Sequence, residues 1–467
     1  MPDRLDSYRR KRDLAVSPEP DDEPRADGDA PRFVIHEHHA RNLHWDLRLE
    51  RDGVLVSFAL PRGLPLDATR NRLALHTEDH PLAYLDFAGE IPAGQYGAGT
   101  MTVFDAGTYV AEKFRDDEVI VRLRGARVEG RYVLFRTGGR NWLIHLMAAA
   151  EGSTRDPFPE GIEPMLAKPS SLPSDDDAWA FEIKWDGVRT LAYVSGGHVQ
   201  LRSRGGLDVT ATYPELQEIG RALGMTEAVL DGEIVALDDA GQPSFGTLQR
   251  RLNVASEAAL RRLQRDVPVI YEAFDLLYLD GHATTALAYR DRRALLEGLD
   301  LAGKHVATPA AHVGDGQAML DASRAQGLEG IVGKRLAAPY EPGRRSGAWI
   351  KLRNPQRVEC VIGGYTRGES GRSGRLGALV VGVREPDGGL RCAGKVGSGI
   401  AGAALDEIEA ALEPLRTSQS PFTAGSVPRG AILVEPRLAC IVEYTEWTSS
   451  RTLRHPVFKG LVAPSRR

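Results

Sequence analysis

The chain has 467 residues and a formal net charge of −5, with 42% hydrophobic and 26% charged residues. This length predicts about three domains, and the composition is that of a globular protein with hydrophobic cores. No apolar run is long enough to span a bilayer, which argues against an integral membrane protein. The three cysteines form no C-x-x-C pair. That spacing argues against a zinc ribbon or a disulfide framework and indicates a reducing compartment.

The basic residues are unevenly divided between lysine and arginine. Only nine of the 59 basic residues are lysines. Arginine therefore carries most of the generic surface charge, and a lysine within a motif becomes a stronger candidate for a chemical role. Because the net charge is negative, nucleic acid would have to bind through local basic surface.

Five segments follow one another along the chain. Residues 1–30 are polar and predict a flexible tail. Residues 31–148 show short alternating strands and glycine-rich turns, which predict a β-rich, barrel-like domain. Residues 149–160 are predicted to be a linker. In residues 161–354 strands alternate with helical stretches, which predicts an α+β domain, and residues 355–467 return to the short strands of a small barrel. The expected helices cover residues 213–223, 257–264 and 289–299.

Histidines are concentrated near the start of the first domain, with four of them in residues 36–44. Strand alternation places His44, Asp46 and Arg48 on one face. Two imidazoles and a carboxylate suit a divalent transition metal with open coordination positions, and the adjacent arginine suits a phosphate. The alternative is a polar strand face that carries histidines. The aspartate in phase with the histidines favours a metal site.

The central domain opens with the segment E-I-K-W-D-G-V-R at residues 182–189. Read as a strand, it buries the apolar residues at 181, 183 and 185 on one face. The other face then presents Lys184 between Glu182 and Asp186. A lysine becomes a useful nucleophile when its amine pKa is lowered by desolvation or by a neighbouring cation. The alternative is an edge strand with a ladder of surface ion pairs.

Four later segments repeat this mixture of lysines, carboxylates and aromatic residues at strand positions. They are residues 229–235, 271–277, 329–334 and 349–353. Each alone is more often a solvated strand face. Together they offer cations for phosphates, carboxylates for a metal and an aromatic ring for a base, which predicts a nucleoside triphosphate site.

The order of these motifs resembles the nucleotidyltransferase motifs of ATP-dependent DNA ligases. The similarity runs from residue 164 to the C-terminus and is closest to the bacterial ligase D enzymes of non-homologous end joining, which share R-H-P-V-F at residues 454–458. The motifs are K-W-D-G-V-R at 184–189, S-R-G-G at 203–206, L-D-G-E at 230–233, F-D at 274–275, E-G-I-V at 329–332 and K-L-R at 351–353.

The resemblance implies that Lys184 attacks the α-phosphate of ATP and carries AMP, with Mg²⁺ or Mn²⁺ as the metal. Glu182 would contact the adenine amine and Phe274 would stack on the ring. The remaining nucleotide contacts would come from Arg189, Arg204, Glu233, Glu329, Lys334 and Lys351. Among these, Glu233 and Glu329 would also hold the metal, Lys334 and Lys351 would contact the α-phosphate, and Arg204 is also a candidate DNA contact. The C-terminal barrel would be an OB-fold.

The first domain, over about residues 30–148, resembles the 3′-phosphoesterase domain of ligase D. The resemblance implies Mn²⁺ bound by His38, His44 and Asp46. The phosphate would be handled by Arg48, Arg62, Arg72, His80 and Tyr84, of which Arg48, His80 and Tyr84 are candidate catalytic residues. His36, His39, His76 and His145 are expected to be structural. Such a domain removes 3′-phosphates and 3′-terminal ribonucleosides and leaves a 3′-hydroxyl.

Two positions depart from the ligase pattern. Gly205 stands where family members usually have Asn. After Phe458 the family usually continues to an acidic residue and a lysine, whereas this chain reads K-G-L-V-A-P-S-R-R. Self-adenylylation is therefore expected to be weaker, unless Lys459 and Arg466 substitute.

The sequence as a whole predicts a cytoplasmic, nucleoid-associated enzyme that cleans 3′ ends and seals nicked or broken double-stranded DNA. Ku is a candidate partner, no membrane is involved, and no stretch is left over for the polymerase domain of many ligase D proteins. One alternative is RNA ligation or capping, which shares K-x-D-G. Others are a ligase whose N-terminal domain only binds DNA ends, and a scaffold with inactive sites.

Overall fold

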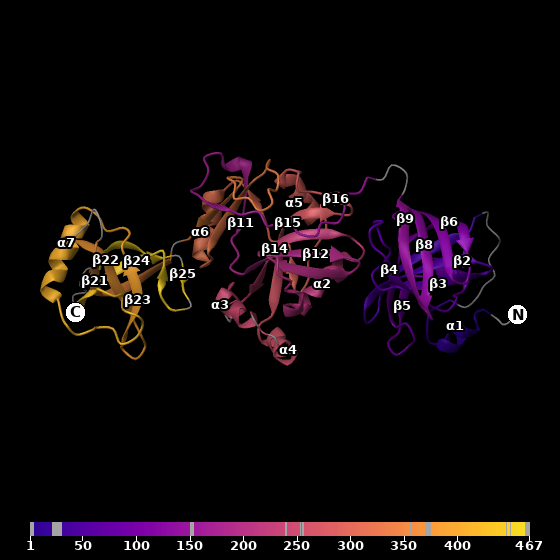
Figure 1. Cartoon of the computed structure of the whole chain (residues 1–467), viewed down its shortest axis with the longest axis horizontal. Helices are drawn as coiled ribbons and strands as arrows, with labels where there is room; N and C mark the ends of the chain where they lie inside the picture. Colours follow the sequence, from indigo (N-terminus) through magenta and orange to yellow (C-terminus); the bar gives the residue numbers. More distant parts are fainter. Residues whose placement is uncertain are drawn as a thin grey trace. The chain divides into compact units, whose positions relative to one another are not determined.

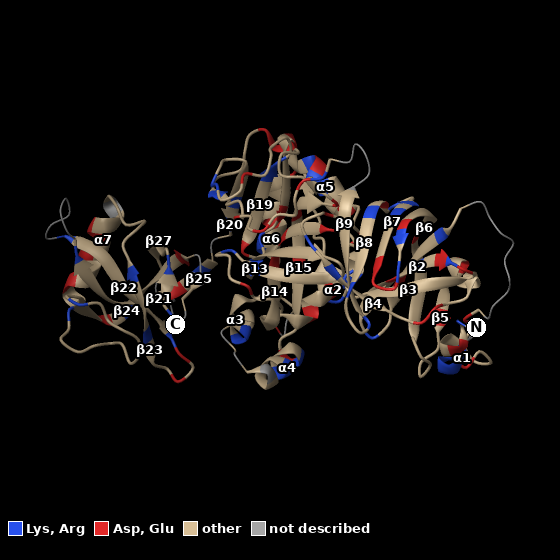
Figure 2. Ribbon diagram, turned by 45° about the vertical axis from the view of Figure 1, so that its right-hand side comes forward, with Lys and Arg blue, Asp and Glu red and all other residues tan. Residues whose placement is uncertain are grey.

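The computed structural model describes residues 4–20, 30–149, 154–238, 241–252, 254, 256–354, 356–368, 375–444, 446–448 and 450–462. The chain divides into two compact units, of which the first holds residues 1–316 and 332–351 and the second residues 317–331 and 352–467. Figure 1 shows the elements in chain order. Within the described residues, no helix is both long and apolar enough to cross a membrane. Both units carry acidic and basic residues (Figure 2).

The N-terminal domain is a nine-stranded antiparallel sheet in the order β1-β2-β3-β4-β9-β8-β7-β6-β5. Pairing between β1 and β6 closes the sheet on itself, which confirms the barrel-like prediction. Asp52 and Gly53 both have positive φ, the conformation that a tight hairpin between β2 and β3 requires. The strands are β1 (Arg32–His39), β2 (Leu43–Arg51), β3 (Val54–Leu60), β4 (Arg72–His76), β5 (Gly89–Ile91), β6 (Gly99–Phe114), β7 (Glu118–Gly125), β8 (Glu129–Gly138) and β9 (Asn141–Ala149).

The prediction of a flexible tail over residues 1–30 is wrong for residues 4–20. They form α1 (Asp6–Lys11) and an extended segment that packs on the barrel. Leu5 and Tyr8 lie three residues apart and are 3% and 0% exposed, so one helical face is buried. Tyr8 donates a hydrogen bond to the carbonyl of Pro20 at 2.7 Å. Residues 21–29 lie outside the described residues.

The predicted linker is also packed where the structure describes it. Residues 154–160 form no helix or strand, but Tyr278 donates to the carbonyl of Asp156 at 2.9 Å. Arg155 pairs with Glu227 at 3.0 Å, and Phe158 packs against buried residues of the central domain. Residues 150–153 fall in the part of the chain that is not described.

Two sheets build the central α+β domain, in the orders β13-β12-β14-β15-β16, with β17 beside β15, and β10-β20-β19-β11-β18. Neighbouring residues of the first sheet point to opposite hydrophobic cores, as Leu191 and Ala192 do, so both of its faces are buried. The first sheet contains β12 (Val188–Ser195), β13 (His198–Ser203), β14 (Ala228–Ala236), β15 (Val269–Leu279), β16 (His282–Ala283) and β17 (Val306–Ala307). The second contains β10 (Lys168–Pro169), β11 (Trp179–Ile183), β18 (His312–Val313), β19 (Gly330–Arg335) and β20 (Trp349–Arg353).

The predicted helices of this domain are present, with shifted ends. A run of 3-10 turns at Thr210–Thr212 and Pro214–Leu216 precedes α2, so the helix expected from residue 213 becomes regular only at 217. Ser256 begins α4 as an N-cap and accepts a hydrogen bond from Ala259 N–H. The helices are α2 (Gln217–Leu223), α3 (Phe245–Leu248), α4 (Glu257–Asp266), α5 (Tyr289–Glu297) and α6 (Gly316–Ala325).

The second unit contains a five-stranded sheet in the order β23-β22-β21-β24-β27. A parallel bridge from Ser398, just after β23, to Val457 in β27 brings the two ends of the order together. This is the small barrel that the sequence predicts. The elements are β21 (Gln356–Arg367), β22 (Leu376–Arg384), β23 (Leu390–Val396), α7 (Ala403–Leu412), β24 (Ile432–Tyr444), β25 (Glu446–Trp447), β26 (Leu453–Arg454) and β27 (Val457–Leu461).

The strand predicted over residues 181–186 is shorter than expected. β11 ends at Ile183, and residues 184–187 form the connection to β12. Glu182 is 3% exposed, so the polar face of this strand is buried as well. At Gly187 a Cβ would lie 2.2 Å from the carbonyl oxygen of Ile234. Only glycine permits this approach, which holds the segment that carries Lys184 against β14.

Candidate active sites

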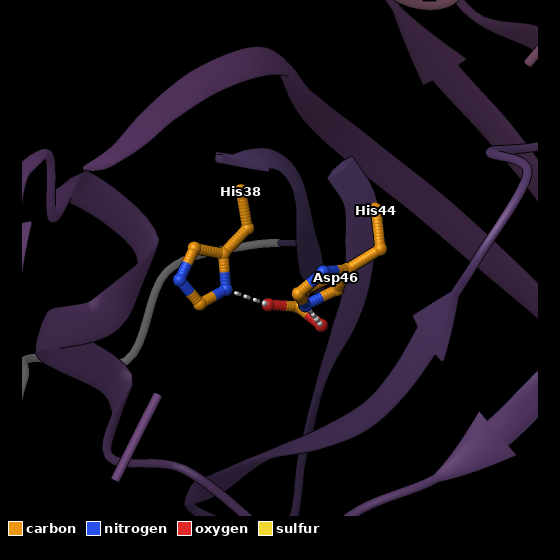
Figure 3. A group of neighbouring side chains, drawn as sticks. All are labelled: His38, His44 and Asp46. Atoms are coloured by element: carbon orange, nitrogen blue, oxygen red, sulfur yellow. Dashed lines mark ion pairs between the residues drawn. The ribbon is translucent and has the colours of Figure 1, made fainter. Parts of the chain in front are cut away.

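His38, His44 and Asp46 come together on the paired strands β1 and β2 (Figure 3). His38 lies directly opposite His44 in the strand register, and their ring centroids are 4.6 Å apart. One ligand atom from each of the three residues lies within 4.8 Å of the others. Alternation along β2 brings Asp46 to the same face as His44.

Backbone carbonyls decide which imidazole nitrogens face the carboxylate. His38 Nε2 lies 2.9 Å from the carbonyl oxygen of Gly97, and His44 Nδ1 lies 3.0 Å from that of Asn42. A carbonyl oxygen only accepts, so these two nitrogens carry the protons. The lone pairs of His38 Nδ1 and His44 Nε2 remain, 3.8 Å and 3.9 Å from oxygens of Asp46. Burial lowers the pKa of His38 to about 4, which keeps the ring neutral. Two imidazole nitrogens and a carboxylate oxygen arranged in this way fit a divalent transition metal.

Arg48 holds the carboxylate of Asp46 in position. Its Nη2 donates to Asp46 Oδ2 at 3.1 Å, its Nη1 to Ser57 at 3.1 Å, and its Nε to His36 Nδ1 at 3.3 Å. His36 is 0% exposed, and burial, with a further contribution from Arg48, lowers its pKa to about 3. His36 is therefore a neutral buried acceptor, in keeping with the structural role expected for it.

His80 and Tyr84 line the same cleft, and both contact the N-terminal segment. Arg12 Nη2 donates to His80 Nε2 at 3.1 Å, and Tyr84 donates to Glu19. Arg12 also pairs with Glu19 at 2.6 Å and with Glu78 at 2.9 Å. Arg12, Glu19 and Glu78 are functional candidates that the sequence reasoning missed. The buried helical spacing of Leu5 and Tyr8 is the signal that could have identified this segment.

These side chains enclose a cavity of about 260 Å³, which we call the histidine cleft. Its walls include the metal-type cluster, Arg12, Arg48, His80, Tyr84 and also Arg140.

Arg62 and Arg72 are not among the described residues that line the histidine cleft. Leu75 of β4 does line it, and Arg72, three residues earlier, points to the opposite face of the strand. There Arg72 is 9% exposed and contacts Glu227 at 3.4 Å and Ser195 at 2.9 Å. Arg62 lies in the turn after β3, and alternation along β4 directs Arg72 away from the cleft. Their expected grouping around the phosphate with Arg48 and His80 is therefore corrected.

In the central domain, a buried group of residues surrounds Glu182. Lys334 Nζ lies 2.9 Å from Glu182 Oε2, and Tyr289 donates to Glu182 Oε1. The Lys334 ammonium also donates to the carbonyl of Phe274 at 2.7 Å. It lies 4.5 Å from the ring centroids of Phe274 and Trp349 and 4.9 Å from that of Tyr289. These five residues form the Glu182 cluster. Burial lowers the pKa of Lys334, and the carboxylate of Glu182 opposes the shift.

A second buried ion pair lies beside this cluster. Arg189 makes a bidentate contact with Asp231, with both nitrogen–oxygen distances 2.6 Å. Tyr340 donates to the same carboxylate at 2.6 Å. The Arg189 guanidinium is 4.7 Å from the Phe274 ring centroid. Burial lowers the pKa of Arg189, but the carboxylate of Asp231 raises it by more, so the net shift of the pKa is upward. The guanidinium expected to contact the nucleotide is therefore already neutralised by a carboxylate.

The remaining predicted residues occupy several elements. Lys184 is half-buried in the connection after β11, and Glu233 on β14 lies next to Gly187. Lys351 is half-buried on β20. Arg204 lines a separate cavity of about 390 Å³ with Tyr193 and Arg202.

Two residues connected with the predicted ligase motifs belong to the second unit. Glu329 pairs with Arg353 at 3.1 Å, and Lys459 pairs with Glu443 at 3.0 Å. Arg466 lies outside the described residues. At Gly205 a Cβ would meet nothing within 4 Å, so the asparagine of the family would also fit.

Three families match the chain in succession. Residues 36–136 match the DNA Ligase D 3′-phosphoesterase domain, residues 164–353 the ATP dependent DNA ligase domain, and residues 372–462 the ATP dependent DNA ligase C terminal region. DNA ligase C1 of Mycolicibacterium smegmatis is 34% identical over 64% of this chain and 89% of its own length. The chain belongs to the ATP-dependent DNA ligase family.

Within that family the chain is of the ligase D type, because the phosphoesterase domain precedes the ligase domains. The multifunctional non-homologous end joining protein LigD of Mycobacterium bovis is 45% identical over 98% of this chain, and that of Pseudomonas aeruginosa is 36% identical over the same share. The chain spans 60% of the length of each of these relatives. A solved structure, "mycobacterial DNA ligase D complexed with ATP and MES", is 39% identical over 65% of this chain and 96% of its own, with a TM-score of 0.40.

Proposed function

We propose that this protein repairs DNA ends in two steps. The N-terminal domain removes a 3′-phosphate or a 3′-terminal ribonucleoside, and the ligase domains then seal the strand with ATP. The observation that carries the proposal is the N, N, O cluster of His38, His44 and Asp46, which shares one compact unit with the K-x-D-G lysine Lys184. The first group suits cleavage of a phosphate ester, and the second suits transfer of a nucleotide.

For the first step, His38 would bind a divalent metal through Nδ1, His44 through Nε2, and Asp46 through its carboxylate. Mn²⁺ is the ion proposed for this set. When bound, it would polarise the phosphate as a Lewis acid. Arg48 holds the carboxylate in place and carries a positive charge beside the position of the phosphate.

Arg12 would supply a second cation to that phosphate. All three nitrogens of its guanidinium are already placed, by Glu19, Glu78 and His80. His80 and Tyr84 would act here by orienting Arg12 and Glu19. A pre-oriented guanidinium stabilises charge that develops on a phosphate without reorganisation.

For the second step, the amine of Lys184 would lose its proton and attack the α-phosphorus of ATP. The bond from that phosphorus to the bridging oxygen would break, and pyrophosphate would leave. Mg²⁺ or Mn²⁺, when bound, would offset the negative charge of the phosphates. The 5′-phosphate of the nick then takes AMP from the lysine. Finally the 3′-hydroxyl attacks that phosphate and releases AMP. A 3′-phosphate blocks this last attack, which is why cleaning must come first.

The nucleotide contacts follow from the same proposal. Glu182 would accept from the adenine amine, and Phe274 would stack on the base. Contacts with the ribose, the phosphates and the metal would come from Arg189, Arg204, Glu233, Glu329, Lys334 and Lys351. Lys334 is already held by Glu182 and by the carbonyl of Phe274. An entering nucleotide would therefore have to displace these contacts before it could bind Lys334, Glu182 or Phe274.

The test uses nicked DNA that ends in a 3′-phosphate. The wild-type protein should seal it, whereas His44→Ala and Lys184→Ala should each fail. On a nick with a 3′-hydroxyl, His44→Ala should seal normally. Lys184→Ala should accept no label from ATP, but should still seal DNA that is already adenylylated. A mixture of the two variants should restore sealing of the phosphate-blocked nick, because cleaned DNA can dissociate and be bound again.

Two outcomes would favour the alternatives. If folded His44→Ala also loses sealing of clean nicks, the N-terminal domain is a DNA-end-binding part of the ligase. If nicked RNA is sealed faster than nicked DNA, the protein is an RNA ligase. Broken chromosomal DNA in the cytoplasm, on the nucleoid, is the proposed substrate. Recruitment by Ku is part of the proposal and can be tested by co-purification.

A further inference from the structure

The barrel and the central domain lie in one compact unit, and the contact between them is closely packed. Met225, shortly after α2, is 2% exposed and belongs to the hydrophobic core of the barrel. Glu227 is also 2% exposed and pairs with Arg72 of β4 at 3.4 Å. At Gly197 a Cβ would lie 3.1 Å from the ring of Trp45. Side chains of the central domain are therefore held against the barrel.

At this contact lies a cavity of about 590 Å³, which we call the interdomain cavity. Strands β2 and β4 of the barrel contribute Leu43, His44 and Leu75 to its lining, and the central domain contributes His198 and Arg221. No described residue that lines it is acidic. Pockets that bind small molecules have volumes of about 300–1,000 Å³, so the interdomain cavity has room for one nucleotide. The histidine cleft, at about 260 Å³, is smaller than this range and suits a phosphate alone.

The interdomain cavity and the histidine cleft adjoin on one face of the barrel. His44, Ala59 and Leu75 line both of them. In the strand register Ala59 of β3 lies opposite Asp46 of β2 and opposite Leu75 of β4, and residues paired in this way share a face of the sheet. His44 shares that face, because it is two residues from Asp46. The metal-type cluster therefore stands at the boundary between the two cavities, where a bound strand end reaches both.

The charge around the interdomain cavity is positive. Arg221 lies exposed in the last turn of α2, and among the described residues no carboxylate pairs with it. His198 reports the same charge, since burial lowers its pKa and both Arg62 and Arg72 lower it further, against the opposing effect of the carbonyl of Pro61. A phosphate that enters the cavity would meet this positive potential and an arginine that has no counter-charge.

We propose that the interdomain cavity binds the nucleotide next to the 3′ terminus that occupies the histidine cleft, and that Arg221 binds a phosphate of the same strand. The apolar side chains of Leu43, Pro61 and Leu75 pack against the sugar and the base, as apolar linings do in ligand pockets. The central domain, which carries the ligase motifs, thereby completes the substrate site of the phosphoesterase. This inference rests on the proposed phosphoesterase function.

The test measures removal of a 3′-phosphate by the full chain from a DNA hairpin with a recessed 3′ end. Arg221→Ala should raise KM about tenfold, the effect of losing one charge-assisted contact, and leave kcat unchanged, because this phosphate is not the one that leaves. The slope of log KM against log salt concentration should fall by about 1. Arg265→Ala is the matched control, because Arg265 is exposed in the last turn of α4 and lines neither cavity. It should behave as the wild type does, and both variants should seal a clean nick normally.

Methylphosphonate linkages, which carry no charge, then identify the phosphate that Arg221 binds. At one linkage near the 3′ end, the substitution should raise KM for the wild type by the same factor and have no further effect on Arg221→Ala. If the two losses multiply at every linkage, or if Arg221→Ala behaves like Arg265→Ala, the interdomain cavity is not the site of the strand.

The wild type also tests the proposed function on which the inference rests. If it leaves the 3′-phosphate in place, the phosphoesterase function fails. The same hairpins and variants are then compared by Kd. Coupling between Arg221 and one linkage would support the interdomain cavity as a binding site for the strand, and its absence at every linkage would overturn the inference.

Discussion

The histidine cleft and the Glu182 cluster orient their reactive side chains by different means. In the histidine cleft, two backbone carbonyls fix the orientation of the imidazoles of His38 and His44. Around Glu182 the groups are held by buried ion pairs, Lys334 with Glu182 and Arg189 with Asp231. A buried ion pair that loses one partner leaves an uncompensated charge, whereas a neutral ring can be removed at small cost. Substitutions in the Glu182 cluster should therefore change both stability and function, whereas substitutions in the histidine cleft should change function with little effect on stability.

The largest expected effect concerns Asp231, whose carboxylate is 0% exposed and accepts from Arg189 and Tyr340. Asp231→Ala should lower the free energy of unfolding by about 3–5 kcal/mol, because the largely enclosed Arg189, whose side chain is 19% exposed, loses its counter-charge. Denaturant unfolding of the full chain measures this loss. His44→Ala, the counterpart from the histidine cleft, should change it by less than about 1 kcal/mol. Equal losses in the two variants would break the comparison.

The next effect concerns Arg12, the one guanidinium brought to the histidine cleft by the N-terminal segment. Arg12→Ala should slow removal of a 3′-phosphate roughly 10²-fold, as expected when one charge-stabilising donor is lost. Sealing of a clean nick should be unchanged. Arg10→Ala serves as a control, because Arg10 is exposed on α1 and, among the described residues, its ion pair is with Asp6 one turn earlier. A normal cleavage rate in Arg12→Ala would mean that the segment only covers the barrel.

A smaller change is expected at Tyr289, whose hydroxyl donates to Glu182. Removal of this hydroxyl leaves the ion pair between Glu182 and Lys334 intact. A hydrogen bond to a charged group contributes about 1.5–3 kcal/mol. Tyr289→Phe should therefore raise the KM for ATP at least about tenfold. The rate of lysine adenylylation at saturating ATP should hardly change. A lowered saturating rate with unchanged KM would place Tyr289 in the chemistry instead of in nucleotide binding.

The last effect is a pH dependence of stability at Glu272 of β15. Burial raises its pKa from 4.5 to about 7. Between these values the unfolded chain has lost the proton while the folded protein keeps it, so the free energy of unfolding should fall as pH rises from 4.5 to 7. The loss is on the order of 3 kcal/mol. Glu272→Gln should abolish this part of the slope in unfolding curves measured across that range. An unchanged slope would mean that the carboxylate is ionised in the folded protein.

Much of the histidine cleft can be predicted from the sequence, because its metal-type cluster is local. His44 and Asp46 are two residues apart on one strand, and His38 is paired with His44 across a hairpin. Alternation and a short connection are enough to bring the three together. Arg62 and Arg72 are expected at the cleft only from the resemblance to the phosphoesterase domain, and the structure places Arg72 on the opposite face of β4 from Leu75, which lines the cleft.

Residues from distant segments could not be placed in this way. Arg12 and Glu19 reach the cleft because a helix with two buried side chains docks on the barrel. Lys334 reaches Glu182 from a position 152 residues later in the chain, through pairing of β19 with β11. The spacing of Leu5 and Tyr8 could have identified the helix, but not that it places Arg12 and Glu19 at the cleft. The pairing of β19 with β11 leaves no periodic signal in the sequence, since it depends on packing between elements that are far apart along the chain.

The sequence by itself determined the order of the domains and the family, because the order of the motifs carries the resemblance to DNA ligases. It also predicts, through that resemblance, that Lys184 is the reactive lysine. Only the tertiary structure decided that both faces of β11 are buried, that Arg189 is neutralised by Asp231, and that an N-terminal arginine enters the histidine cleft. The physical reason is that alternation says which side chains share a face, whereas burial and charge pairing depend on what packs against that face.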